Sequence, residues 1–231
     1  METDSEIWQK FIALPGSIAG EYVGIASQYA ISGLLEILYK RSPRRILEIG
    51  AGIGTLTYTI LSWARSVNMD QKMDYTFITI ENNAFCQKQL TNNLISFRDK
   101  YCLVSSMDEV RQICTQFDLI VVDGGDDLPS DMGFMAFNNL LQLKGAIFVE
   151  GERIIQRQKI REWYGNRLHI YVKMEAAQPH LQSLSGNISA TNLPYHLFIF
   201  EPNFIEAISY KVGGLLNYTD TRLARNVMRA K

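Results

Sequence analysis

The sequence lacks the features that define several classes of protein. Its 231 residues include only three cysteines, Cys86, Cys102 and Cys114, and no two of them have CxxC spacing. An odd number of dispersed cysteines argues against a disulfide scaffold and favours reduced thiols in a cytoplasmic protein. No stretch approaches the roughly 18 consecutive apolar residues of a transmembrane helix, and the acidic start METDSEIWQK does not resemble a signal peptide. We therefore expect a cytoplasmic protein with no membrane partner.

A surplus of positive charge is also missing. The 23 Lys and Arg residues are balanced by 24 Asp and Glu residues, which gives a formal net charge of -1. Broad binding to nucleic acid requires a basic field, so DNA is not an expected partner. The chain does have an ordinary share of hydrophobic residues, 47%, and enough length for one large α/β domain or two small ones.

The clearest local pattern is an alternation of β-rich and helical segments. Continuous apolar runs are typical of strands buried on both faces of a parallel sheet. The expected strands are residues 44–50, 75–81, 101–106, 117–125, 145–151, 167–174 and 195–202. Helical patterns occupy residues 55–67, 84–97 and 131–142, the last with Ser130 as its N-cap. The alternation predicts a doubly wound α/β fold whose last two strands form an antiparallel pair at one edge.

Composition divides the chain into three segments. We expect residues 1–40 to form an N-terminal helical extension or lid, residues 41–202 to form the α/β domain, and residues 203–231 to be a C-terminal extension of that domain. The C-terminal extension ends in a basic stretch, which fits either a solvated surface helix or a site for an acidic partner. The basic run KRSPRR at 40–45 enters the first strand from its amino end, and we expect it to be a solvated corner.

A glycine-rich turn, LEIGAGIGTLT at residues 47–57, joins the first strand to the first of these helices. Open parallel sheets bind ligands at the carboxyl ends of their strands, where this turn lies. A nucleoside triphosphate site requires GxxxxGK[ST], but no Lys or Arg occurs between Ile46 and Ala64. A dinucleotide site requires GxGxxG, but Thr55 stands at the third glycine position, and Glu48 at the mouth of the loop would repel a pyrophosphate. A cationic nucleoside such as S-adenosylmethionine fits the turn better.

The same turn resembles a family motif. The run Glu48-Ile49-Gly50-Ala51-Gly52-Ile53-Gly54 is similar to the first motif, [DE]xGxGxG, of the class I S-adenosylmethionine-dependent methyltransferases. The resemblance covers about residues 40–202. It implies a seven-stranded sheet of order 3-2-1-4-5-7-6, mostly parallel with an antiparallel strand seven, and helices on both faces. It also implies that Glu48 and the three glycines hold the methionine part of the cofactor.

Further cofactor contacts are implied at the ends of the second and third strands. Glu81, 27 residues beyond Gly54, stands where an acidic side chain accepts hydrogen bonds from both ribose hydroxyls, and Asn82 follows it. NAD enzymes use the same device, so Glu81 indicates a nucleoside without choosing between the two cofactors. Ser106 and Met107 match the loop that contacts adenine in this family. Met107 fits the start of a core helix stripe equally well.

The methyl acceptor is less constrained by the sequence. Asp123 emerges from the fourth strand, where the family places its methyl-transfer residues. The motif [DNS]PP[YFW] of enzymes that methylate DNA bases is absent there, and VVDGG looks more like small-molecule O-methyltransferases. We therefore expect a hydroxyl of a small molecule as acceptor. A protein or RNA acceptor is an alternative, and so is a partner subunit that binds the cofactor without catalysis.

A divalent cation such as Mg²⁺ is a further expectation from the resemblance. In the metal-dependent branch, an Asp after strand four and an Asp-Asn pair after strand five bind the ion. Asp123 and Glu150 match two of these ligands, and Gly151 replaces the Asn. Hard cations take several oxygen ligands, so other side chains would have to complete the site: Asp126, Asp127 or Glu152. Asp123 is the main catalytic candidate, as base or metal ligand, and Glu150 is the second, although DGGDD also fits a plain acidic turn.

His180 is the third catalytic candidate. It lies in the polar segment 178–194, and a loop of this length between the last two strands is expected to overhang the cofactor site. His169 and His196 lie within strand patterns and are expected to be structural. We also consider a homodimer as the state of assembly.

Overall fold

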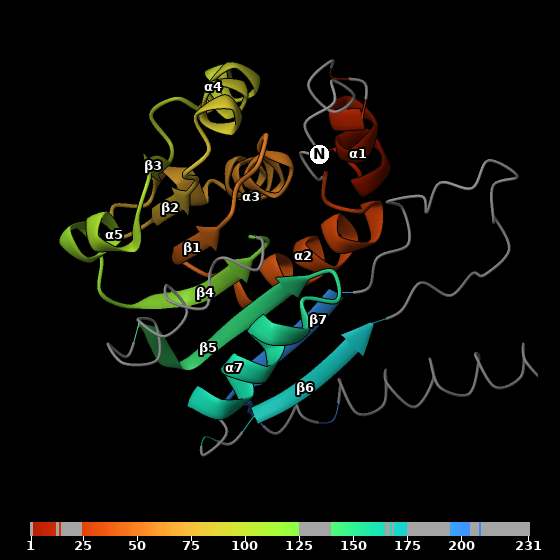
Figure 1. Cartoon of the computed structure of the whole chain (residues 1–231), viewed down its shortest axis with the longest axis vertical. Coiled ribbons are helices and arrows are strands. Elements are labelled where there is room, and N and C mark those ends of the chain that lie inside the picture. The colour runs from red at the N-terminus through yellow and green to blue at the C-terminus, as the bar shows by residue number, and fades with distance from the viewer. Residues whose placement is uncertain are drawn as a thin grey trace, which may run out of the picture.

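Seven strands form one sheet that runs through the middle of the molecule (Figure 1). The computed structural model describes residues 2–12, 14, 25–124, 140–164, 167, 169–174, 195–203 and 208. The strands are β1 (Arg45–Ile49), β2 (Thr76–Ile80), β3 (Cys102–Val104), β4 (Phe117–Val122), β5 (Leu141–Glu150), β6 (His169–Met174) and β7 (Tyr195–Phe200). Their order is β3-β2-β1-β4-β5-β7-β6, and β7 is antiparallel to both neighbours. The predicted fold class, strand order and antiparallel edge are confirmed.

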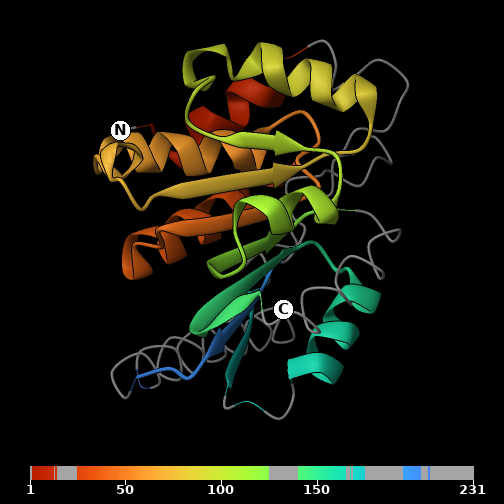
Figure 2. The ribbon, with the colours of Figure 1, turned by 90° about the vertical axis from the view of Figure 1, so that its left-hand side faces the viewer.

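Helices cover both faces of this sheet (Figure 2). They are α1 (Asp4–Ile12), α2 (Gln28–Arg41), α3 (Thr55–Ser66), α4 (Ala84–Asn93), α5 (Met107–Ile113) and α7 (Ile154–Tyr164). Short 3-10 turns follow α3 and α4, at Met69–Gln71 and Ile95–Phe97. Helices α1 to α4 share one cluster of buried apolar side chains, and α5 and α7 share the cluster on the other face. In the described segments, no helix has both the length and the apolar character needed to cross a membrane.

Strand β1 shows why the strand sequences are apolar without alternation. Ile46 packs into the cluster on the α3 face, whereas Leu47 and Ile49 pack into the cluster on the α5 and α7 face. Successive side chains of a strand point to opposite faces, so a strand covered by helices on both sides has no solvent-facing position. Glu48 therefore has to be buried within the sheet, although it is charged in water.

The helix predicted for 131–142 is wrong at its C-terminal end. Residues 125–139 lie outside the described part of the chain, but strand β5 already begins at Leu141. Leu140 accepts a hydrogen bond from the backbone N–H of Phe117, and Leu141 is the partner of Phe117 in the sheet. Both leucines are buried in the cluster of the α5 and α7 face. A ladder with β4 thus buries the apolar residues that the periodicity assigned to a helix.

Helix α2 is fixed against the end of the sheet. Its N-cap, Ser27, accepts a hydrogen bond from the N–H of Ala30 at 3.0 Å. Gly33 packs so closely on β7 that an added methyl group would lie 2.3 Å from the ring of Tyr195. The first turn of α2 is thereby held beside the carboxyl end of β5, where the N–H of Ser27 donates to Glu150 at 3.5 Å. Whether residues 1–40 act as a lid stays a prediction.

The basic run at residues 40–45 lies at the amino end of β1, as expected. The backbone N–H groups of Arg44 and Arg45 both donate to Asp118 at 2.9 Å, and the exposed side chain of Arg44 pairs with Asp74. A hollow of about 290 Å³ opens nearby, between the end of α2 and the start of β4. The glycine turn follows the carboxyl end of β1. This hollow therefore lies at the opposite end of the strands, away from the turn.

Candidate functional site

The glycine turn brings the ends of β1 and β4 together. Gly50 has a φ of +84°, a conformation that residues with a Cβ atom adopt only with strain. A methyl group added at Gly50 would lie 2.3 Å from the Cα atom of Gly124, which follows β4. Only a hydrogen fits between these backbones. The turn is therefore a close approach of two strand ends, and the motif glycine is required for that reason.

Hydrogen bonds from the backbone hold the turn on β2. The N–H groups of Gly50 and Ala51 donate to the carbonyl oxygen of Ile80, at 3.0 and 3.1 Å. Gly54 closes the turn onto Ala51 at 2.9 Å and is the N-cap of α3. The N-terminus of α3 thus begins directly after the turn. A ligand there would meet backbone atoms and the positive end of the helix dipole, which suits a carboxylate.

Glu81 is positioned by the glycine turn itself. One carboxylate oxygen accepts from the N–H of Gly52 at 2.7 Å, and the other accepts from the N–H of Asn83 at 2.8 Å. Two carboxylate oxygens offer about four acceptor sites, so each keeps capacity for another donor. The side chain is buried, whereas Asn82 beside it is exposed. This geometry presents an oriented pair of acceptors next to the turn, as a ribose with two hydroxyls requires.

Ser106 and Met107 lie at the carboxyl end of β3, where α5 begins. The hydroxyl of Ser106 donates to Glu109 at 3.0 Å, and the N–H of Ser105 donates to the same carboxylate oxygen at 3.2 Å. Met107 is buried and packs in the apolar cluster of the α5 and α7 face. The core-stripe interpretation of Met107 is therefore confirmed. Its contact with an adenine ring stays a prediction.

Glu48 lies beneath the turn, and the expectation that it stands at the mouth of the loop is wrong. Its side chain is fully buried, and one carboxyl oxygen accepts from the hydroxyls of Thr57 and Thr79, each at 2.7 Å. The other oxygen has no hydrogen-bond partner among the described residues. Burial raises the pKa of Glu48 to about 8, although the two hydroxyls oppose this rise, and the charges of Asp123 and Glu81 add to it. With this pKa the carboxyl group keeps its proton at neutral pH, so it lies beneath the turn as an uncharged group.

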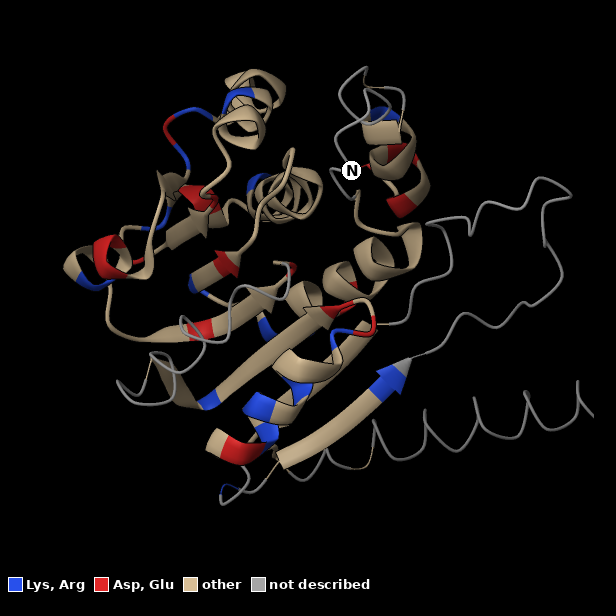
Figure 3. Ribbon diagram, in the orientation of Figure 1, with Lys and Arg blue, Asp and Glu red and all other residues tan. Residues whose placement is uncertain are grey.

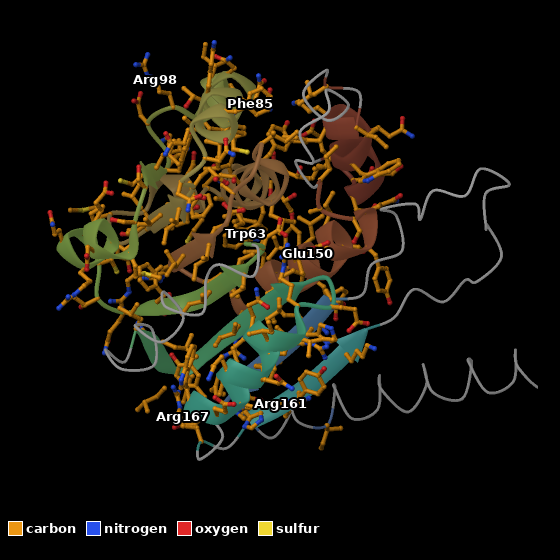
Figure 4. All side chains as sticks on the ribbon, viewed as in Figure 1. Trp63, Phe85, Arg98, Glu150, Arg161 and Arg167 are labelled. Carbon is orange, nitrogen blue, oxygen red and sulfur yellow. The ribbon has the colours of Figure 1, made fainter. Side chains whose placement is uncertain are left out.

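Asp123 and Glu150 meet at the ends of β4 and β5, with Arg153 between them. Arg153 Nη2 lies 2.8 Å from Asp123 Oδ1 and 3.6 Å from Glu150 Oε2. Figure 4 shows Glu150 near the centre of the molecule, at the end of its strand. Burial raises the pKa of Glu150 to about 8, and the negative charge of Asp123 adds to that rise. Burial also raises the pKa of Asp123, and Arg153 counteracts the rise.

Sequence reasoning missed Arg153 and Ser27 as parts of this site. Arg153 carries a signal, because it follows Glu150 by three residues and is the first cation after β5. Ser27 carries none, because its contact with Glu150 joins segments 123 residues apart. His180, Asp126 and Asp127 lie outside the described residues.

His169 and His196 lie in β6 and β7 and are structural, as expected. Nδ1 of His196 lies 2.7 Å from the hydroxyl of Tyr171, and its ring stacks on the ring of that tyrosine. Burial lowers the pKa of His196 to about 4, and the cation Arg157 lowers it further. His169 bonds the carbonyl oxygen of Arg167 at 2.9 Å. Neither ring is hydrogen-bonded to Asp123 or Glu150.

Solved structures with the same architecture include several methyltransferases. An O-methyltransferase from Bacillus cereus, bound to S-adenosylhomocysteine, aligns with a TM-score of 0.58 at 15% identity over 86% of this chain and 90% of that one. The O-methyltransferase TomG from Streptomyces achromogenes, in complex with S-adenosylmethionine, aligns with a TM-score of 0.56 at 15% identity over 87% and 90%. The fold is that of the class I methyltransferases.

Other comparisons show that the similarity extends to the fold but not to one kind of methyl acceptor. A putative RNA methyltransferase from Pyrococcus horikoshii aligns with a TM-score of 0.53 at 15% identity over 87% of this chain and 98% of that one. No protein-family model matches the chain, and no curated protein matches its sequence. The resemblance inferred from the glycine turn is thus confirmed for the fold, and the chemistry has to be argued from the residues.

The described donors at the ends of β4 and β5 do not fit the divalent cation of the metal-dependent methyltransferases. Among the described residues, no three His, Cys, Asp or Glu side chains are grouped to hold a metal ion. Asp123 and Glu150 already face the guanidinium of Arg153. Gly151 has no side chain to act as the third ligand, and Glu152 pairs instead with Arg157 at 3.0 Å.

Proposed function

We propose that the protein is an S-adenosylmethionine-dependent methyltransferase that methylates a hydroxyl group of a small molecule. The observation that carries this proposal is the carboxylate of Glu81, which the N–H of Gly52 holds at 2.7 Å beside a glycine turn. The turn and the acid belong to successive parallel strands, β1 and β2, and meet at the carboxyl edge. A nucleoside that carries an amino-acid group instead of a phosphate matches both the carboxylate of Glu81 and the glycine turn.

The charges around the turn favour a cationic cofactor. Glu81 and Asp123 are close enough for their charges to act on one another, so they form one acidic region beside the turn. S-adenosylmethionine brings a sulfonium and an ammonium, and opposite charges attract strongly where water is excluded. Its ribose would bind Glu81, its adenine would lie near Ser106 and Met107, and its amino-acid part would pass the glycines.

The transfer step requires a base and a close approach. The oxygen of the acceptor attacks the methyl carbon as the carbon–sulfur bond breaks, and the bonding pair stays on sulfur, which leaves neutral S-adenosylhomocysteine. The hydroxyl proton goes to a carboxylate, for which we propose Asp123. Asp123 stands at the carboxyl end of β4, beside Gly50, and Arg153 fixes its carboxylate. Holding both reactants in line would supply much of the rate.

The small-molecule acceptor is favoured over a macromolecule by the overall charge of -1. Lys and Arg residues do gather on α7, as Figure 3 shows. However, Arg157 and Lys159 are paired with Glu152 and Glu162, which cancels much of that charge. An RNA acceptor would instead require basic residues left open to phosphates.

Titration calorimetry with S-adenosylmethionine tests the cofactor. We expect saturable binding by the wild type, and loss of about 100-fold in affinity for Glu81→Ala, because two hydrogen bonds to a charged group would be lost. Glu36→Ala, an exposed acid on α2 that pairs with Lys40, is the matched control and should bind normally. Absence of saturable heat in the wild type would refute the proposal.

Transfer of a labelled methyl group tests the acceptor. A panel of phenols, catechols and aliphatic alcohols is compared with total RNA and with a protein extract. Labelling confined to the small molecules supports the proposal, and labelling of RNA with a steep salt dependence supports the RNA alternative. Binding of the cofactor without turnover on any acceptor would support a non-catalytic partner subunit.

A further inference from the structure

We propose that Arg153 occupies the place of the divalent cation found in metal-dependent enzymes of this fold, so that methyl transfer by this protein requires no metal. The inference about the reaction rests on the proposed function, whereas the inference about ion binding does not. Three observations carry it: the contacts of the guanidinium, the turn that brings it there, and the ligands that a metal would need.

The guanidinium contacts both carboxyl groups that match metal ligands. Its Nη2 atom lies 2.8 Å from Asp123 Oδ1, 2.6 Å from the carbonyl oxygen of Asp123 and 3.6 Å from Glu150 Oε2. The side chains of Asp123, Glu150 and Arg153 are 16%, 5% and 22% exposed, so water screens these contacts weakly. One cation thus bridges the ends of two neighbouring strands, β4 and β5.

The chain after β5 is shaped to return Arg153 to this position. Gly151 has a φ of +71°, and a methyl group added there would meet nothing within 4 Å, so the backbone angle rather than space calls for glycine. The carbonyl oxygen of Arg153 accepts from the N–H of Arg157 at 3.1 Å, so Arg153 stands in the N-cap position, immediately before α7. A cation at a helix N-terminus is opposed by the helix dipole. The two carboxyl groups offset that cost.

A metal ion and Arg153 cannot share this site. Mg²⁺ requires near-octahedral oxygen ligands at about 2.0–2.1 Å. However, Oδ1 of Asp123 is hydrogen-bonded to the guanidinium of Arg153, which stays protonated in proteins. Placing a doubly charged ion a few ångströms from that guanidinium would be strongly repulsive. The position of the third ligand is Gly151, which offers no side-chain oxygen.

Arg153 is therefore a positioning residue. It holds the carboxylate of Asp123 at the carboxyl edge of the sheet and supplies a fixed positive charge there. A metal-dependent enzyme obtains both effects from the ion. The assignment predicts that removal of the guanidinium creates a metal site.

Titration with Mn²⁺, followed by electron paramagnetic resonance of the free ion, tests this on the full chain without cofactor or acceptor. We expect no specific binding by the wild type up to about 1 mM, the weak end of oxygen-ligand sites. Arg153→Gln should gain one site with an affinity at least about tenfold higher. Arg153→Lys should behave as the wild type, and Arg161→Gln, an exposed arginine of the same helix (Figure 4), should also stay unchanged.

The double variant Glu150→Gln with Arg153→Gln should lose the gained site, which locates the ion on the acid pair. Stoichiometric Mn²⁺ binding by the wild type would overturn the proposal, and so would the absence of any gain in a folded Arg153→Gln. If circular dichroism shows that Arg153→Gln is unfolded, the wild type and Arg153→Lys still decide whether a metal binds.

Activity provides a separate arm. Chelation by EDTA should leave the turnover of the wild type unchanged, and loss of turnover that Mg²⁺ restores would overturn the proposal. Arg153→Gln should lower kcat and leave the affinity for S-adenosylmethionine unchanged, whereas equal loss of both would contradict a positioning role. If the wild type binds no S-adenosylmethionine, the proposed function fails while the Mn²⁺ result still stands.

Discussion

The two halves of the site stabilise their acidic side chains in different ways. In the half formed by β1 and β2, Glu48 accepts from two threonine hydroxyls and Glu81 accepts from two backbone N–H groups. In the half formed by β4 and β5, Asp123 and Glu150 face the guanidinium of Arg153. Hydrogen bonds from neutral donors orient an acidic side chain without compensating a negative charge on it. A guanidinium both orients a carboxylate and compensates its charge.

This difference separates two tasks. The β1 and β2 half keeps the negative charge of Glu81 for a cationic ligand, in agreement with the proposed binding of S-adenosylmethionine. The β4 and β5 half is internally compensated by Arg153, in agreement with the proposed transfer to a neutral acceptor without a metal. Four variants test this comparison, beginning with the contact that joins the halves.

Gly50→Ala should have the largest effect, because Gly50 is where the halves touch. The new methyl group would lie 2.3 Å from the Cα atom of Gly124, and the φ of +84° would add strain. We expect a loss of at least about 3 kcal/mol in unfolding free energy, or no folded protein. The matched control is Gly151→Ala, which has a similar φ but open space and should cost about 1 kcal/mol. Urea denaturation compares them, and equal losses would show that the close approach is unimportant.

Glu48→Gln should change how stability depends on pH. The pKa of Glu48 is about 8 in the folded protein and about 4.5 in a free chain. The folded state therefore holds a proton that the unfolded state has released, and stability falls as pH rises from about 4.5 to 8, by up to about 1.4 kcal/mol per pH unit. Glutamine can accept the same hydroxyl bonds without this penalty. Unfolding at pH 5 and pH 8 should show the variant gaining on the wild type by up to about 4 kcal/mol. A constant difference across this range would mean that Glu48 is ionised throughout.

The two halves also differ in how far the sequence predicts them. The first half was predictable, because its residues stand at regular distances from a motif: Gly50, Gly52 and Gly54 in the turn, and Glu81 at the end of the next strand. These distances follow from the geometry of a parallel sheet. The burial of Glu48 was not predicted. The position of a residue in a strand does not show how far its side chain is buried until the helices on both faces of the sheet are known.

The second half was only partly predictable. The spacing of the strands located Asp123 and Glu150, but the expected metal depended on donors that had to be supplied from elsewhere. The cation that pairs with Asp123 and Glu150 is Arg153. Its position depends on the left-handed backbone conformation of Gly151, which the composition of the segment does not predict. The end of the predicted helix at 131–142 failed for a similar reason, because pairing with β4 outweighed local periodicity.

Glu81→Gln sharpens the comparison on the side of the first half. Glutamine keeps one oxygen acceptor but replaces the other with an N–H₂ donor, which would face the N–H of Gly52 or of Asn83. We expect S-adenosylmethionine to bind about tenfold more weakly, an effect smaller than that of Glu81→Ala. Calorimetry measures both variants, and Glu36→Gln, at an exposed position of α2, serves as the control. Unchanged affinity in Glu81→Gln would show that the ribose bonds elsewhere.

Ser27→Ala should have the smallest effect and tests how α2 supports the second half. The substitution removes the side-chain cap on the N–H of Ala30 but keeps the backbone N–H that faces Glu150. Loss of such a cap costs about 1 kcal/mol, whereas Ser27→Gly should cost only a few tenths. Both variants should keep the affinity for S-adenosylmethionine, because the first half does not use α2. A fall in kcat at unchanged affinity would show that the first turn of α2 positions Glu150, and loss of cofactor binding would show that the two halves are not independent.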